Sequence, residues 1–79
     1  MFLATDEDRD LAKRVIIDEY KDTKQVLTDA MIASKVDEVI NISYYIGGSY
    51  ELNTLRKIVQ SIIKRENLWI TLFLLMSLK

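Results

Sequence analysis

Three aspartates near the start of the chain, Asp6, Asp8 and Asp10, have the spacing with which a calcium-binding loop begins. Closely spaced carboxylate oxygens can wrap around a hard cation. The rest of such a loop does not follow, because Leu11 stands where it needs glycine and Ile17 stands where it needs a bidentate glutamate. The acids instead favour the first turn of a helix, whose free amide groups and dipole stabilise negative charge.

Few other residues in this sequence could carry out catalysis. There is no histidine and no cysteine, so the common nucleophile–base pairs and the usual zinc ligands are missing. Asp18 and Asp22 are spaced to share one helical face, and we interpret them as solvated charges. Asn41 begins a glycosylation acceptor pattern, but it lies inside a predicted helix. We therefore predict a non-enzymatic protein without a metal or cofactor.

A basic group between residues 52 and 65 is a stronger candidate for a binding surface. Its members are Arg56, Lys57, Gln60, Lys64 and Arg65. On a recognition helix, the cations would contact phosphates and Gln60 would contact a base edge. The isoelectric point near 5.3 argues against this reading, because nucleic-acid-binding domains are usually basic. A solvated face, or a docking surface for the acidic first helix, is the alternative.

Helices must position all of these residues, because the sequence lacks proline and its only two glycines are adjacent, at positions 47 and 48. Thr5 followed by Asp8 predicts a capped helix start. The polar run at 21–25 then interrupts the apolar series. It is either a turn or an exposed part of one longer helix, and the sequence leaves both alternatives open.

Further helices are predicted from the remaining apolar sets. A second set lies at 26–31, and Ser34 resembles the N-cap of a third helix that ends at Gly47. The clearest amphipathic pattern starts at Leu52. Asn67 is a candidate cap for a separate last helix. The whole pattern predicts an all-α protein: one domain over residues 1–79, folded as a compact bundle of four or five short helices.

Glu66 is the one charged residue on the otherwise apolar stripe of this amphipathic pattern. The stripe runs through Leu55, Val59 and Ile62 and would continue, in the same phase, to Glu66 and the residues beyond. This mismatch is the reason to expect a helix break between residues 64 and 67.

An apolar run after residue 67 is the most unusual feature of the sequence. The predicted interface residues within it are Leu68, Trp69, Leu72, Phe73, Leu75 and Met76. A helix that is apolar around its circumference must be enclosed by something. The alternatives are a core made by its own chain, a second subunit, a membrane or the groove of another protein. Twelve residues rise about 18 Å, well short of a bilayer core of about 30 Å.

A second subunit is the alternative that we favour, because a two-fold dimer lets identical apolar helices cover each other. We therefore predict a homodimer with a shared C-terminal helix core. Glutamates in place of Leu72 and Leu75 would then abolish both the dimer and the fold.

Function is predicted to be protein–protein binding, by a small regulatory or adaptor protein that docks on a larger protein. The alternatives are a helix-turn-helix-like nucleic-acid-binding protein that uses the basic group at 52–65, and a membrane-surface protein held by the apolar run. In the latter, Trp69 with Lys64 and Arg65 would lie at the lipid–water boundary. The start of the chain does not resemble a secretory signal, and the lack of cysteine fits a reducing compartment. We expect a cytoplasmic location.

Overall fold

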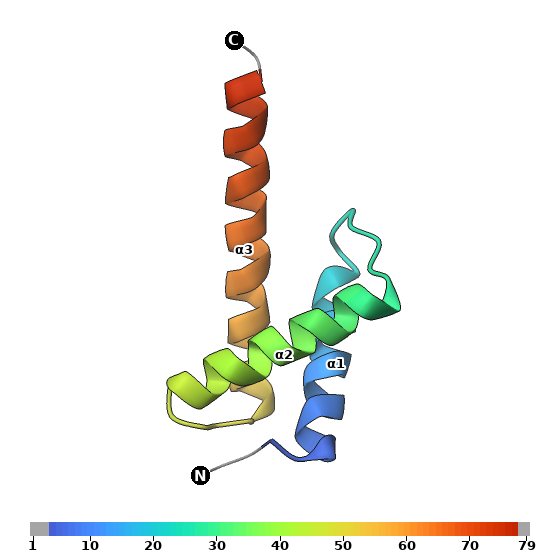
Figure 1. Ribbon diagram of the computed structural model, residues 1–79, viewed down its shortest axis with the longest axis vertical. Coiled ribbons are helices and arrows are strands. Elements are labelled where there is room, and N and C mark those ends of the chain that lie inside the picture. The colour runs from blue at the N-terminus through green and yellow to red at the C-terminus, as the bar shows by residue number, and fades with distance from the viewer. Residues whose placement is uncertain (1–3, 78–79) are drawn as a thin grey trace.

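The computed structural model describes residues 4–77, which form three α-helices and no strand (Figure 1). The helices are α1 (Asp6–Tyr20), α2 (Asp29–Tyr45) and α3 (Leu52–Ser77). The all-helical class is thereby confirmed. The expected number of helices, four or five, is wrong, because two pairs of helices predicted as separate are each continuous.

Helix α1 begins where the sequence predicts. The Thr5 hydroxyl accepts a hydrogen bond from the Asp8 amide, and the Asp8 carboxylate accepts one from the Thr5 amide. This capping box supplies partners for two amide groups that the helix itself leaves free. Helix α1 ends at Tyr20, whose carbonyl accepts a hydrogen bond from the Thr23 hydroxyl. The polar run at 21–25 therefore belongs to a loop.

Helix α2 replaces the predicted second and third helices. Its N-cap is Thr28, whose hydroxyl accepts a hydrogen bond from the Met31 amide. Ser34 lies within the helix and is exposed, so the predicted cap at this position is wrong. A serine followed three residues later by an acid also suits the wet side of a helix, where its hydroxyl faces solvent. The exposed Val26 lies in the loop before α2 and starts no helix.

The turn between α2 and α3 uses both glycines. Gly47 and Gly48 have φ angles of 131° and 76°, which favour residues without a Cβ atom. The fully buried Ser43 donates a hydrogen bond to the Ser49 carbonyl and ties the end of α2 to this turn. Helix α3 then begins at Leu52, as predicted.

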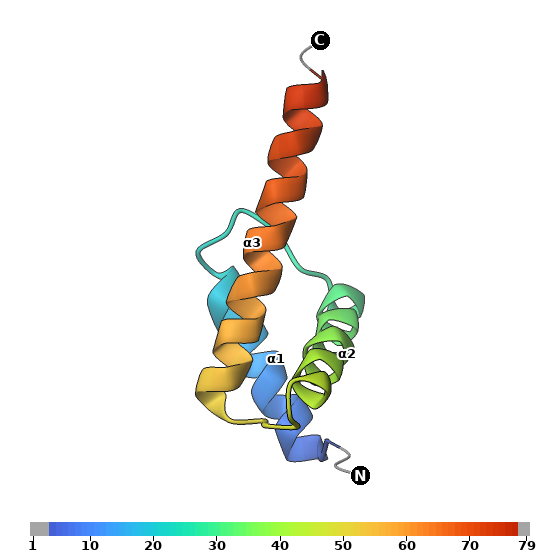
Figure 2. The ribbon, with the colours of Figure 1, turned by 90° about the vertical axis from the view of Figure 1, so that its left-hand side faces the viewer.

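The three helices share one core, and α1 and α2 both pack against the first half of α3. In Figure 1, α1 lies to the right of α3 and α2 crosses in front of it, and in Figure 2, α2 lies to the right of α3. The buried apolar residues of the core are Ala12, Val15, Ile16, Tyr20, Val36, Val39, Ile40, Leu55, Ile58, Val59 and Ile62. Helix α3 does not break at Asn67, and its second half extends beyond the other two helices. We call residues 4–66 the head and residues 67–77 the tail.

Candidate functional site

The tail is the part of the described chain that exposes the most apolar surface. Each of its large apolar side chains is between 49% and 75% exposed. They are Leu68, Trp69, Ile70, Leu72, Phe73, Leu74, Leu75 and Met76. The head does not enclose them, so the alternative in which the chain's other helices surround this segment is wrong.

Three of these side chains continue the core stripe of α3. Leu55, Val59 and Ile62 are buried in the head, and alternating steps of four and three residues lead from them through Glu66 to Trp69, Phe73 and Met76. We call Trp69, Phe73 and Met76 the seam. They are the most exposed apolar residues of the tail, at 69%, 70% and 75%. One apolar stripe therefore runs along α3, covered in the head and uncovered in the tail.

The opposite side of the tail, which we call the outer face, contains Leu68, Thr71 and Leu75. Toward the head, the same side of α3 carries Gln60 and Lys64.

The two hydroxyl groups of the tail form hydrogen bonds within its own helix. The Thr71 hydroxyl donates a hydrogen bond to the Asn67 carbonyl, and the Ser77 hydroxyl donates one to the Phe73 carbonyl, both at 2.9 Å. Residues 67–77 include no charged side chain. The tail thus has its hydroxyl groups paired within its own helix.

A polar cluster joins all three helices where the tail leaves the head. Glu66 on α3 accepts hydrogen bonds from the Tyr20 hydroxyl of α1, at 2.9 Å, and from the Lys35 ammonium of α2, at 2.7 Å. The Lys35 Nζ atom also lies 5.0 Å from the centre of the Tyr20 ring. A charged residue is therefore tolerated at this position of the stripe, because α1 and α2 supply hydrogen-bond partners for Glu66. Helix α3 continues through this position without a break.

The charges of this cluster stabilise one another. Burial by itself would raise the pKa of Glu66, but the hydrogen bonds from Lys35 and Tyr20 outweigh it and lower that pKa below its ordinary value. Burial would likewise lower the pKa of Lys35, but its interactions with Glu66 and Tyr20 raise it. Burial raises the pKa of the Tyr20 phenol. At neutral pH the cluster contains a charged carboxylate, a charged ammonium and a neutral phenol.

The five members of the predicted basic group differ in whether they contact the other helices. Arg56 lies 3.5 Å from Glu19 of α1, and Gln60 donates to the same carboxylate at 3.4 Å. Arg65 forms a 2.5 Å ion pair with Glu38 of α2. Three of the five side chains therefore hold α3 against the acidic residues of the head. Lys57 and Lys64 form no ion pair within residues 4–77 and remain candidates for contact with a partner.

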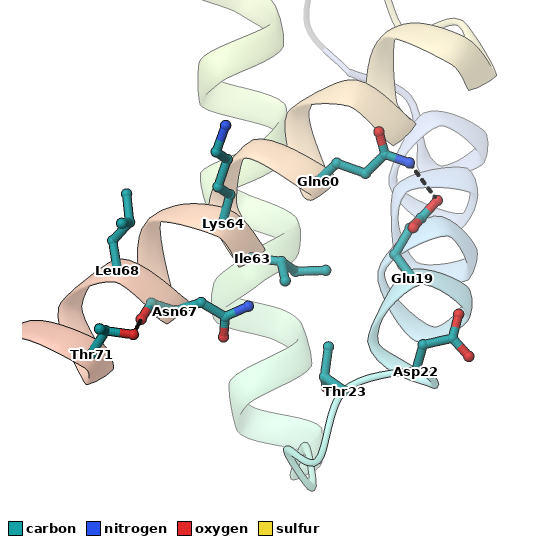
Figure 3. Close-up of a pocket in the computed structure, with 9 residues that line it drawn as sticks. All are labelled: Glu19, Asp22, Thr23, Gln60, Ile63, Lys64, Asn67, Leu68 and Thr71. Carbon is teal, nitrogen blue, oxygen red and sulfur yellow. Dashed lines mark hydrogen bonds between the residues drawn. The ribbon is translucent and has the colours of Figure 1, made fainter. Parts of the chain in front are cut away.

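A shallow pocket of about 450 Å³ lies beside the base of the tail (Figure 3). Ile63 and Asn67 of α3 point toward Thr23 in the loop after α1, whereas Lys64 and Leu68 point away. Glu19 and Asp22 line the pocket on the α1 side. The side chains that face the pocket are thus mainly polar, with Ile63 as the apolar exception, and they include no nucleophile–base pair.

The acids singled out from the sequence do not assemble into a site. Asp8 serves the capping box, and Asp18 lies 3.9 Å from Lys21. Within the described residues, no group of three or more acidic side chains is placed to hold a metal ion. The polar cluster was missed by sequence reasoning, although Glu66 gave a signal as the single acid on an apolar stripe.

No protein-family model, curated protein or solved structure matches this chain. None of the helices in residues 4–77 has the length and apolar character needed to cross a membrane.

Proposed function

We propose that this protein is a small non-enzymatic binding protein that acts as a homodimer, with the tail as the contact between two copies. The observation that carries the proposal is the exposure of eight large apolar side chains on one projecting helix. If these side chains remained exposed to water, the protein would lack on the order of 10 kcal/mol of stabilisation that their burial would provide. That is comparable to the whole stability of a small domain, about 5–15 kcal/mol.

The dimer leaves the heads free for a second partner, which supports a regulatory or adaptor role toward a larger protein. Lys57 and Lys64 lie on the side of α3 away from the core, and neither forms an ion pair in the described part of the chain. They are suited to steer an acidic surface toward the head. As part of the same proposal we expect a cytoplasmic location, because a protein without cysteine suits a reducing compartment.

The mass of the intact chain in solution tests the dimer directly. Light scattering coupled to size exclusion, in a dilution series without detergent, is expected to give about 18 kDa, twice the 9.2 kDa of one chain. A mass of one chain at every concentration would refute the proposal.

A second candidate is attachment to a lipid surface. It is favoured by the hydrogen bonds of Thr71 and Ser77 to their own helix, since the tail would carry no unpaired hydroxyl into an apolar layer. Flotation with vesicles of phosphatidylcholine and phosphatidylserine tests it. Binding that is lost in Trp69→Ser and Phe73→Ser would support this candidate, and failure of the intact protein to float would exclude it.

A further inference from the structure

We infer that two copies of the chain pair through the seam in an antiparallel arrangement, with their heads at opposite ends of the dimer. This inference rests on the proposed homodimer and adds the face, the direction and the register of the contact. It follows from the position of the head relative to the apolar stripe of α3.

The seam is the face of the tail best suited to a second helix. Trp69, Phe73 and Met76 repeat at the spacing with which paired helices interlock, and they are the most exposed apolar residues of the tail. Ile70 and Leu72 flank them. The outer face has the small polar Thr71 at its centre and continues downward into Gln60 and Lys64. A contact through the outer face of parallel chains would bring Lys64 of each copy toward the other.

A parallel contact through the seam is blocked by the head. Helices α1 and α2 both pack against the buried stripe in the first half of α3. They approach it from two directions: α1 lies beside α3 and α2 crosses in front of it in Figure 1, and α2 lies to the right of α3 in Figure 2. In a parallel pair whose seams face each other, both heads would lie between the two α3 helices at the same height. The two heads would then occupy the same space.

An antiparallel contact avoids this collision. Each head lies beyond the tip of the other tail, and the overlap is limited to residues 67–77, about 16 Å of helix. A longer overlap would drive each tip into the opposite head. This limit sets the register, in which Trp69 of one copy lies beside Met76 of the second copy and both Phe73 side chains lie near the two-fold axis.

The register also places the tip of each tail above the polar cluster of the other copy. Trp69 follows Glu66 by one turn on the same side of α3. The Glu66 and Lys35 side chains are already only 26% and 15% exposed. A second tail over this surface would shield these two side chains further from water. The contact between the two tails therefore ends at the polar cluster.

The available area is compatible with a second copy. Stable protein interfaces bury about 800 Å² on each partner. The side chains in and beside the seam are Trp69, Ile70, Leu72, Phe73 and Met76, and their uncovered parts amount to several hundred Å² per copy, somewhat below but on the order of that value.

Small-angle X-ray scattering on the unmodified protein, with the mass measured on the same sample, tests the inference. One chain is 49 Å long. Twice this length, less the overlap, gives a maximum dimension of about 80 Å for the antiparallel dimer. A dimer of about 50 Å would overturn the antiparallel arrangement and leave the homodimer standing. A mass of one chain would overturn both.

Disulfide formation tests the face and the register, because the natural chain contains no cysteine. Trp69→Cys mixed with Met76→Cys is expected to give a cross-linked pair, whereas either variant alone is expected to stay uncross-linked. Within one helix these positions are about 10 Å apart, too far for a disulfide. The matched control is Leu68→Cys mixed with Leu75→Cys, on the outer face.

Two cross-linking results would overturn the inference. Self-linking of Trp69→Cys would show parallel chains, and linking of the Leu68→Cys and Leu75→Cys mixture would show contact through the outer face. If the smaller side chains weaken the dimer so that none of the variants links, scattering by the unmodified protein decides the arrangement.

Discussion

The two halves of α3 have the same apolar stripe and opposite surroundings. In the first half Leu55 and Val59 are fully buried by α1 and α2, whereas in the second half Phe73, on the same stripe, is 70% exposed. The polar cluster around Glu66 lies at the boundary between them. The spacing of apolar residues therefore predicts which side of a helix will be covered, but does not identify what covers it.

The largest effect is expected from a charge in the seam. Phe73→Glu should raise the dissociation constant of the dimer about 1,000-fold, equivalent to about 4 kcal/mol, because a carboxylate would enter an apolar contact. The head should keep its fold, since glutamate is a good helix former and Phe73 touches none of the core. Light scattering and circular dichroism measure the two effects.

The control for this variant is Leu75→Glu on the outer face, with an expected change of less than about 10-fold. Equal losses of dimer affinity in the two variants would indicate surroundings that are apolar on all sides, as in lipid.

The structure also changes the expectation for the variant with glutamates at both Leu72 and Leu75. Among residues 4–77, every buried core residue lies within the head, so we expect the fold to persist when the dimer is lost.

A second variant compares the same deletion in the two halves of α3. Leu55→Ala in the core should lower the free energy of unfolding of the head by about 3 kcal/mol, because it leaves a cavity that the neighbours fill only partly. Leu74→Ala in the tail should change it by less than about 0.5 kcal/mol. Urea unfolding in the monomeric Phe73→Glu background separates folding from association. A similar loss at both positions would show that the tail packs on its own head.

A third variant tests the boundary cluster. Glu66→Gln should destabilise the head by about 2 kcal/mol at pH 7, because Lys35 would remain charged and partly buried without its carboxylate. Glu38→Gln removes the partner of Arg65 at a more exposed ion pair and should cost less than about 0.5 kcal/mol. Urea unfolding measures the loss in free energy of unfolding for each variant.

The pH dependence of the cluster has a defined sign. The folded pKa of Glu66 is lowered, so its contribution is complete above the ordinary value of 4.5 and is lost as the pH falls through the lowered folded pKa. The folded pKa of Lys35 is raised, so its contribution is complete below 10.5 and is lost as the pH rises through the raised value. The difference in stability between the unmodified protein and Glu66→Gln should therefore shrink in acid. A constant difference from pH 7 to pH 2 would contradict this account.

The smallest effects are expected from two threonines. Thr28→Ala should cost about 1 kcal/mol of head stability, because it removes the cap of α2. Thr71→Ala should change neither head stability nor dimer mass measurably, because its hydroxyl bonds only to its own helix and lies outside the seam. A dimer weakened by Thr71→Ala would place the contact on the outer face. Thermal unfolding and light scattering measure both variants.

Local signals in the sequence were sufficient where the interactions are local. The capping box of Thr5 and Asp8, the glycine turn and the start of α3 at Leu52 each depend on residues a few positions apart, and all three are confirmed. Ser34 failed as a cap because a serine three residues before an acid also occurs on an exposed helical surface, and Thr28 takes the role. The predicted basic residues lie on one helix, but their directions and glutamate partners depend on α1 and α2.

The all-helical class, the first turn of α1, the glycine turn and the phase of the apolar stripe can all be predicted from the amino-acid sequence. These are set by backbone propensity, capping and helical periodicity, which act over a few residues. The continuity of α3 and the division of its stripe into a covered and an uncovered half depend instead on contacts between helices. Glu66 reads as a break in a linear pattern, but Tyr20 and Lys35 reach it from two other helices, 46 and 31 positions away. Such contacts are made by packing, and no local propensity encodes them.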